Sequence, residues 1–507
     1  MTPLVRSSVC RTELKECNGR RRRPAPAFVI LLIVLTGLGC APSHRPGLPP
    51  GNPFTRSAGS SGPLLTHGLT VGDVTGSSAL IWLRMDRPGL AWVEWEVEQA
   101  EGGSGMTGSS AIRQTDVAHD YTVSIPLEGL ASATRYRYWV YAAPLNEGGA
   151  VQPDEIGAGR FVTAAPAEAN GPLTFVWSGD LGGQRRCRDA ETGYAIFDRI
   201  GQLRPAFALL LGDLIYGDDR CPAPPNVPGS DFVAADLAGY RTKHRYQRED
   251  RALQQFLAAV PVHVTWDDHE VKNNFSGSVE PLMPVGRQAL LEYWPIATPP
   301  GDPFRLYRKV RHGADVELFI LDTRQYRSSN TLPDGPNKTM LGAAQRSWLL
   351  EELSRSTATW KVIASSVPLA NAKPGSALIP GNDSWALGPD GTGFETELRT
   401  IIQHILDRRI RNVVWLVADV HYSQVNEYDP DGDGQAEFYE FICGPLSAAL
   451  AKAVLPNPTF NPTTLYTGEV FQNFGVITVD GASLHLAIVD EKGNTRFNRR
   501  FSARPAR

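Results

Sequence analysis

The sequence predicts a layered α/β domain preceded by a small β-sandwich, and three observations carry this prediction. Residues 64–165 contain short alternating runs, such as SALIWLRM and RYRYWVYAA, which turn residues separate at regular intervals. From residue 166 onward, strand-like apolar runs alternate with helix-like segments. The length of 507 residues also exceeds that of one ordinary domain.

Residues 1–40 are typical of an export signal. Arg20 to Arg23 precede a short apolar run, Phe28 to Leu38, which ends in the small residues TGLGC. The run is too short to span a bilayer as a helix. Cys40 after Gly39 resembles the cysteine of a lipoprotein signal, although plain cleavage and release, or a twin-arginine signal, would use similar residues. We therefore expect a cell-envelope or periplasmic location, with membrane attachment through lipidated Cys40 as one option.

Residues 41–63 are rich in Pro, Gly and Ser and predict a flexible tether. In an oxidising compartment Cys187 and Cys221 could pair across their loop. Cys443 lies in the apolar run FYEFICG and is interpreted as a core residue. The net charge of −4 gives no electrostatic reason to expect nucleic-acid binding.

The α/β elements follow in order along residues 166–507. Five further strand-like runs follow LTFVWSGD: AFALLLGDLIYGDD, VPVHVTWDDHE, DVELFILDTRQY, TWKVIASSVPL and RNVVWLVADVHY. The helix candidates are ETGYAIFDRIGQL, GAAQRSWLLEELSRS and FETELRTIIQHILDRR.

Polar side chains stand where these apolar strands end. They are Asp180, Asp213 with Tyr216, Asp267-Asp268-His269, Asp322, and Asp419 with His421. Ligand sites in α/β sheets lie beyond the carboxyl ends of strands. One such Asp alone is more often a helix cap or a turn residue. Several carboxylates converging on one edge would repel each other unless cations bind there, and oxygen with imidazole suits hard or borderline metals.

Four segments resemble, in this order, motifs of the PhoD-like alkaline phosphatases and phosphodiesterases, which belong to the calcineurin-like metallophosphoesterases: GDLIY, WDDHEVKNN, LDTRQYRS and ADVHYSQ. The stretch GLTVGDVTGSSALIWLRMDRP resembles the fibronectin-type sandwich that such proteins carry in front. The resemblance covers nearly all of the chain after the signal. It implies a fibronectin- or immunoglobulin-like sandwich at 64–165 and a catalytic domain of two mixed sheets flanked by helices at 166–507.

The resemblance also implies a binuclear centre of Fe³⁺ with Ca²⁺, Zn²⁺ or Mn²⁺. The implied ligands are Asp180, bridging Asp213, the ferric ligand Tyr216, Asp268, Asp419 and His421, with His269 as the catalytic histidine. Two departures from the family pattern stand out. Asp180 replaces the cysteine of many PhoD-type sequences, and the fourth superfamily histidine is missing from VIASSVPLA.

Other candidates keep two interpretations each. Arg324 could clamp a phosphate oxygen or pair with Asp322 or Asp268. Asn273 and Asn274 could complete a coordination shell or start a helix or loop. The segment DPDGDGQAEFYE has the spacing of an EF-hand calcium loop, whereas an Asp-Gly hairpin turn is the simpler alternative; its residues are Asp429, Asp431, Asp433, Gly434 and Glu440.

We therefore expect an exported, metal-dependent phosphoesterase that hydrolyses phosphate monoesters or diesters by metal-activated hydroxide. Its substrate would be a small-molecule or lipid phosphate ester. One alternative is a phospholipid or nucleotide phosphodiesterase using the same site. The other is a non-catalytic surface lipoprotein.

Overall fold

The structure is a computed structural model that describes residues 62–98, 105–145, 153–371, 384–386 and 393–505. The predicted export signal, with Cys40, and nearly all of the predicted tether lie outside these residues. Among the described residues, no helix has both the length and the apolar character needed to cross a membrane.

The first part of the described chain forms two antiparallel layers. One layer contains β1 (Leu65–Gly72), β2 (Ser78–Met85) and β6 (Thr122–Glu128). The other contains β3 (Gly89–Val97), β4 (Thr107–Ser109), β5 (Arg113–Thr115), β7 (Arg135–Pro144) and β8 (Asp154–Val162). Alternate residues of both layers, including Ile81, Val93 and Tyr138, are buried in one shared core. A short 3₁₀-helix, η1 (Val117–His119), precedes β6.

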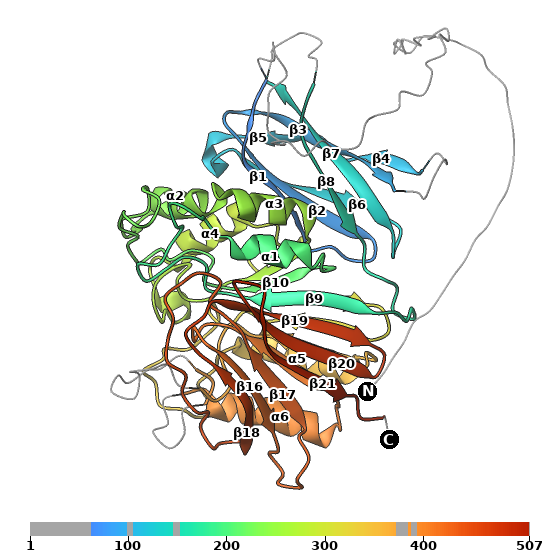
Figure 1. The fold of residues 1–507 in the computed structure, drawn as a ribbon, viewed down its shortest axis with the longest axis vertical. Helices are drawn as coiled ribbons and strands as arrows, with labels where there is room; N and C mark the ends of the chain where they lie inside the picture. Colours follow the sequence, from blue (N-terminus) through green and yellow to red (C-terminus); the bar gives the residue numbers. More distant parts are fainter. Residues whose placement is uncertain (1–61, 99–104, 146–152, 372–383, 387–392, 506–507) are drawn as a thin grey trace, which may run out of the picture. The chain divides into compact units, whose positions relative to one another are not determined.

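The first layer continues into a nine-stranded sheet (Figure 1), whose order is β21-β20-β19-β9-β10-β11-β1-β2-β6. Its parallel centre consists of β9 (Leu173–Ser178), β10 (Ala208–Leu211) and β11 (Val262–Thr265). The antiparallel strands β19 (Asn473–Asp480), β20 (Ser483–Asp490) and β21 (Thr495–Ser502) extend it on the other side. The sheet therefore joins segments from both ends of the described chain.

A second sheet of seven strands has the order β12-β13-β14-β15-β17-β16-β18. Its parallel members are β13 (Val316–Ile320), β14 (Trp360–Ala364), β15 (Val413–Val417) and β17 (Phe438–Ile442). The antiparallel members are β12 (Arg308–His312), β16 (Ser423–Tyr428) and β18 (Pro462–Gly468).

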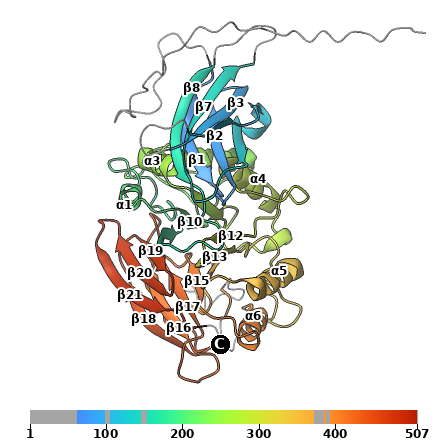
Figure 2. The same cartoon turned by 90° about the vertical axis from the view of Figure 1, so that its right-hand side faces the viewer.

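The two sheets pack over a core that includes Trp177, Leu318, Val414 and Ile477. On the outer face of the seven-stranded sheet lie α5 (Gly342–Arg355) and α6 (Glu395–Asp407), as Figure 2 shows.

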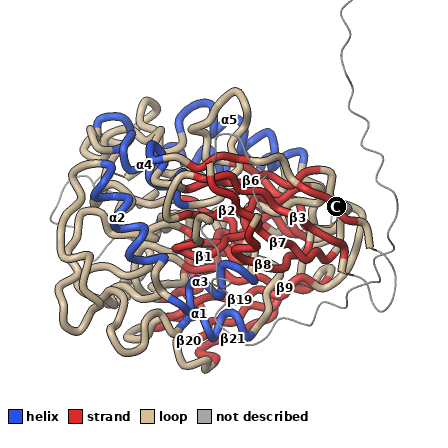
Figure 3. Tube along the Cα trace, turned by 90° about the horizontal axis from the view of Figure 1, so that it is seen from above, coloured by secondary structure: helices blue, strands red, loops and turns tan. Residues whose placement is uncertain are grey.

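The nine-stranded sheet is covered by α1 (Ile196–Gln202), α3 (Arg251–Ala259) and α4 (Met283–Tyr293). Helix α2 (Leu237–Arg248) packs beside α4 (Figure 3), and η2 (Gly277–Val279) precedes α4. The predicted fold class, two mixed sheets flanked by helices behind a β-sandwich, is confirmed.

Candidate metal centre

Both sheets contribute to one cluster of polar side chains beyond the carboxyl ends of their parallel strands. Asp180 follows β9, Asp213 follows β10, and Asp267 to His269 follow β11 in the nine-stranded sheet. Asp419 and His421 follow β15 in the facing sheet. This placement matches the general position of ligand sites in α/β sheets.

The possible donor atoms fall into three overlapping groups, in each of which the atoms lie within 4.8 Å of one another. The groups are Asp180, Asp213 and His421; Asp213, Asp268 and His269; and Asp213, Asp267, Asp268 and Asp419. All of these residues are buried. Asp213 is the only member common to the three groups, which is the geometry of a carboxylate shared between two ions.

Tyr216 and His421 approach each other at one end of this cluster. The Tyr216 hydroxyl lies 3.0 Å from Nε2 of His421, which in turn lies 3.6 Å from Oδ1 of Asp180. Nδ1 of His421 is 2.5 Å from the carbonyl oxygen of Ala449 and donates to it. That bond fixes the tautomer with Nε2 as the basic nitrogen, the arrangement common for metal-binding histidines.

The backbone holds four of the predicted ligands in the left-handed region. The φ angles are 63° at Asp180, 53° at Asp213, 73° at Asp419 and 61° at His421. Each such conformation costs about 1–3 kcal/mol and persists only where the surrounding structure enforces it, and such strain clusters at functional sites. Gly444 leaves room for the carboxylate of Asp180, because a Cβ at position 444 would lie only 2.4 Å from Oδ2 of Asp180.

The electrostatics of the cluster also fit bound cations. Burial raises the pKa of Asp213 well above its ordinary value, and the neighbouring carboxylates, first Asp268 and then Asp267, raise it further. Burial, followed by the charge of Asp213, likewise raises the pKa of Tyr216. Carboxylate, phenol and imidazole donors crowded together in this way suit hard or borderline cations, whose charge would offset the repulsion.

Glu270 organises the loops of the cluster, a role that sequence reasoning missed. Its carboxylate accepts hydrogen bonds from the backbone nitrogens of Asp213 (3.0 Å), Leu214 (2.7 Å) and Asp267 (2.9 Å). Burial raises its pKa to about 7. Glu270 thus ties the loop after β10 to the loop after β11. Its position directly after the Asp-Asp-His run was the available signal.

His269 has a carboxylate partner that was also missed. Nδ1 of His269 lies 2.6 Å from Oδ1 of Asp218, and its ring stacks on Tyr216 with the ring centroids 4.2 Å apart. Oδ2 of Asp218 accepts from the backbone nitrogen of Asn273 at 2.7 Å. The sequence signal was the acidic pair at the end of GDLIYGDD, whose first member, Asp218, lies five residues after Asp213.

Arg324 contacts two carboxylates of the cluster and is completely buried. Its Nε is 2.5 Å from Oδ1 of Asp267, and its Nη2 is 3.7 Å from Oδ2 of Asp268. Asp322 does not pair with this guanidinium: its Oδ1 accepts from the backbone nitrogen of Arg324 and from Nε1 of Trp266. Asp322 therefore acts as a turn cap and belongs to none of the donor groups.

Asn273 and Asn274 make their described contacts through the backbone. The nitrogen of Asn274 donates to Oδ2 of Asp268 at 2.7 Å, and its carbonyl accepts from Nδ2 of Asn330. Coordination by either asparagine side chain stays a prediction.

The acidic segment that begins at Asp429 is the connection between the antiparallel strands β16 and β17. Its carboxylate donors come from Asp429, Asp431, Asp433 and Glu437, and lie within 4.8 Å of one another. The predicted twelfth position, Glu440, is not among them, because its carboxylate accepts from Leu369 N and Tyr428 Oη in the core. Calcium binding here stays a prediction, and the flanking strands agree with the hairpin alternative.

Cys187 and Cys221 form a disulfide with their Cα atoms 5.9 Å apart, which closes the loop that follows Asp180. Cys443 is a buried free cysteine in the core between the sheets, as predicted.

Comparison with known proteins identifies the family models and relatives that this chain resembles. The family model described as PhoD-like phosphatase matches residues 181–482, and the model of the PhoD-like phosphatase N-terminal domain matches residues 52–165. Alkaline phosphatase D of Bacillus subtilis (strain 168) is 28% identical over 407 residues. That alignment covers 72% of this chain and 66% of the relative, slightly less than two thirds of its length.

Two solved structures share the fold. The structure of PhoD matches with a TM-score of 0.67 and 22% identity, over 89% of this chain and 94% of that chain. The purple acid phosphatase from yellow lupin (Lupinus luteus) seeds matches with a TM-score of 0.61 and 13% identity, over 86% and 74%. At these identities the two structures show the fold alone.

Proposed function

We propose that this chain, which belongs to the PhoD-like phosphatase family, is a metal-dependent hydrolase of phosphate monoesters or diesters. The observation that carries the proposal is the position of Asp213, whose carboxylate is shared by three buried donor groups at the facing edges of two sheets. A carboxylate shared in this way can bridge two neighbouring cations.

The donor groups support two neighbouring cation positions. Fe³⁺ would lie near Asp180, Tyr216 and His421, where a phenolate is available. A divalent ion, Ca²⁺, Zn²⁺ or Mn²⁺, would lie near Asp268 and Asp419, where the donors are carboxylates. Bound cations would neutralise charge on the ester oxygens and supply a nucleophile at neutral pH.

His269 is the proposed general acid. Hydrogen bonding of Nδ1–H to Asp218 leaves Nε2 as the atom that holds the proton destined for the leaving alkoxide. A carboxylate at this position favours the charged imidazolium, which is the form that can donate a proton. His269 is itself a member of one donor group, so its role must be separated from ligation by experiment.

Arg324 is better described as a positioning residue than as a phosphate clamp. Its guanidinium is buried and contacts the carboxylates of Asp267 and Asp268. From there it would hold two carboxylates in place and offset part of their charge.

Several finer statements belong to the same proposal. Residues 1–40 would direct export, with Cys40 as a lipidated amino terminus, and residues 41–63 would tether a fibronectin-like domain at 64–165 and the catalytic domain at 166–507. The substrate would be a small-molecule or lipid phosphate ester. A phospholipid or nucleotide phosphodiesterase would use the same residues, whereas a non-catalytic lipoprotein would have no need of the buried carboxylate groups.

One experiment tests the core of the proposal. The purified protein is assayed against matched aryl phosphate monoesters and diesters, and the same sample is analysed for iron and divalent metals. Turnover that scales with occupancy of two metals per chain is expected. A metal-replete sample that hydrolyses neither ester would refute the proposed activity.

A further inference from the structure

A cavity of about 690 Å³ lies at the other end of the seven-stranded sheet from the metal donors. It is lined by the first part of β14, by the segment before β15, by the carboxyl ends of α5 and α6, and by residues just after β21. The metal donors Asp419 and His421 follow the opposite end of β15. Strand β15 has five residues and therefore spans roughly 17 Å, so a small molecule in the cavity would not reach the metal centre.

The charged side chains that line this cavity are all basic. They are Lys361, Arg408, Arg409, Arg411 and Arg504, and none of the described Asp or Glu residues lines it. The whole chain carries a net charge of −4, so the grouping does not reflect a generally basic protein.

These charges are largely uncompensated. Arg504 pairs with Glu437 at 3.1 Å. Within the described part of the chain, the other four form no ion pair with a carboxylate. Nη1 of Arg411 donates to the carbonyl of Pro505 at 2.7 Å, and Nζ of Lys361 donates to the carbonyl of Ala358 at 2.6 Å. Burial lowers the pKa of Lys361, and the charge of Arg311 lowers it further, while the charge of Glu317 acts in the opposite direction.

A helix terminus alone does not account for the group. Arg408 is the C-cap of α6 and Arg409 follows it, so both gain from the negative end of the helix dipole. Lys361 is a strand residue, however, and Arg504 belongs to the segment after β21. Their presence requires a different explanation.

The neighbouring segments are held together by Asn412. Its Oδ1 accepts from the backbone nitrogen of Arg504 at 2.8 Å, and its Nδ2 donates to the Arg504 carbonyl at 3.2 Å. Its own carbonyl accepts from the backbone nitrogen of Lys361 at 3.0 Å. The three chain segments that carry the basic side chains therefore have a fixed relative position before any ligand binds.

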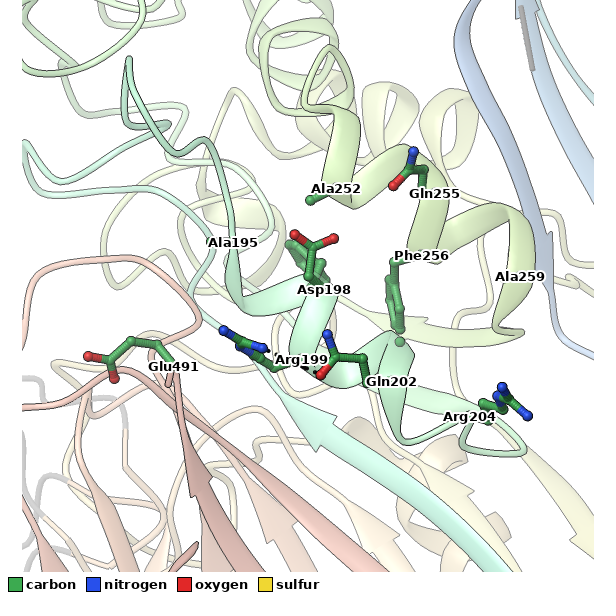
Figure 4. A pocket seen from close by; sticks show the side chains of 12 residues that line it. Ala195, Asp198, Arg199, Gln202, Arg204, Ala252, Gln255, Phe256, Ala259 and Glu491 are labelled. Atoms are coloured by element: carbon green, nitrogen blue, oxygen red, sulfur yellow. Dashed lines mark hydrogen bonds between the residues drawn. The ribbon is translucent and has the colours of Figure 1, made fainter. Parts of the chain in front are cut away.

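A second cavity provides a contrast. It measures about 550 Å³ and is lined by residues of α1, α3 and the turn after β20 (Figure 4). Arg199 and Arg204 line it together with the carboxylates of Asp198 and Glu491. An exclusively basic set of charged lining residues is therefore not a general feature of the cavities in the described part of the protein.

We infer that the basic cavity binds an anion carrying several phosphate groups, at a site separate from the metal centre. Guanidinium groups pair with phosphate oxygens through two parallel hydrogen bonds, and several of them around one cavity select multiply charged over singly charged anions. The volume suits a small molecule or a headgroup. A soluble oligophosphate and an anionic phospholipid headgroup share this chemistry.

The test measures binding of inorganic tripolyphosphate to the metal-replete protein by calorimetry. The Arg408→Gln/Arg411→Gln double variant should bind at least about 10-fold more weakly, because two charge-assisted contacts are lost. Arg408→Lys/Arg411→Lys should retain part of the affinity. The matched control, Arg199→Gln/Arg204→Gln, removes the same charge from the second cavity and should bind like wild type.

Two further arms locate the site and identify the source of the phosphate. Tripolyphosphate binding should persist in Asp213→Ala, which lacks the proposed shared metal ligand. The Arg408→Gln/Arg411→Gln variant should hydrolyse aryl phosphates at the wild-type rate. Sedimentation with cardiolipin vesicles, whose headgroup carries two phosphates, would identify a lipid headgroup if it is lost in the double variant. Tripolyphosphate binding without vesicle binding would identify a soluble ligand. Equal affinity in the double variant and wild type, or binding lost only in Asp213→Ala, would overturn the inference.

Discussion

Oδ1 of Asp218 lies 2.6 Å from Nδ1 of His269, so a carboxylate and an imidazole form a dyad at the edge of the donor cluster. The opposite nitrogen of the ring is thereby the one that can hold a transferable proton. This arrangement suits a proton donor and a metal ligand equally, because both use the Nε2 atom, and the two roles make different predictions.

If His269 is the general acid, His269→Ala should retain both metals and lose roughly 10²–10⁴ in turnover. The loss should be largest for substrates whose leaving groups have a high pKa, because these need the proton most. Kinetics across a leaving-group series, with metal analysis of the same sample, measure this. Asp213→Ala is the contrast, since loss of the shared carboxylate should remove metal and activity together. Metal loss in His269→Ala comparable to that in Asp213→Ala would make the histidine a ligand instead.

Asp218→Asn should lower turnover by about 10–100-fold while the metals stay bound, because an amide orients the ring poorly and no longer favours the imidazolium. The limb of the pH–rate profile on which activity falls as pH rises should shift to lower pH, because the general acid must be protonated and loss of the neighbouring negative charge makes the imidazolium easier to deprotonate. Asp231→Asn, at an exposed position in the same region, is the control. An unchanged pH profile would show that Asp218 does not act through His269.

Tyr216 should give the metal-replete protein a visible charge-transfer band, because a phenolate bound to Fe³⁺ absorbs visible light. Tyr216→Phe should lose this band and keep its fold, since phenylalanine preserves the ring that stacks on His269. Absorption spectra before and after substitution measure this. A fully active wild-type protein that is colourless and free of iron would show that the assignment is wrong.

Arg324→Met should destabilise the protein by about 3–5 kcal/mol, because it leaves the buried carboxylates of Asp267 and Asp268 without their cation. Denaturant unfolding of metal-free protein measures the change in the free energy of unfolding. A phosphate clamp would behave differently: KM would rise, and stability would stay close to that of wild type.

His244 predicts a loss of stability in acid. Burial lowers its pKa to about 3, with a further contribution from Arg248, whereas the unfolded chain binds the proton near pH 6.5. Between these pH values the unfolded state holds more protons, so stability falls as pH decreases below 6.5, by at most about 1.4 kcal/mol per pH unit from this residue.

His244→Phe preserves the stack on Tyr293 and should flatten that dependence. Thermal unfolding of metal-loaded protein at several pH values between 4.5 and 7.5 measures it, with exposed His485→Gln as the control. Parallel curves for wild type and His244→Phe would contradict the prediction.

Periodicity was sufficient to predict the elements that pack on one face. The segment 342–356 was predicted to be a helix from its spacing of apolar residues, and α5 covers Gly342–Arg355. The candidate at 394–409 likewise corresponds to α6. The candidate at 191–203 is helical only from Ile196, because Gly193 adopts φ 59° and Asp189 caps a turn before it.

The strand-end rule selected residues that the fold brings to one edge, but it did not distinguish those that face the cluster. Asp322 follows a strand as Asp180 does, yet its hydrogen bonds to Trp266 and to its own turn direct it elsewhere. Asp218 and Glu270 were missed for the opposite reason. Their partners lie 51 to 57 residues away in the sequence, and a loop carries no periodicity that could indicate such contacts.

Gly72 pairs with Val262, the backbone nitrogen of Asp73 donates to the Val262 carbonyl at 3.0 Å, and Arg308 donates to the Val264 carbonyl. These contacts cover the outer border of β11, which is an edge strand among those that residues 166–507 contribute to the nine-stranded sheet. A chain shortened to begin near residue 166 would present that border to solvent, where unpaired backbone groups recruit other strands and promote aggregation. The amino-terminal layers therefore protect the catalytic sheet from self-association. Residues 64–165 and 166–507 should be expressed together, because they form one folding unit.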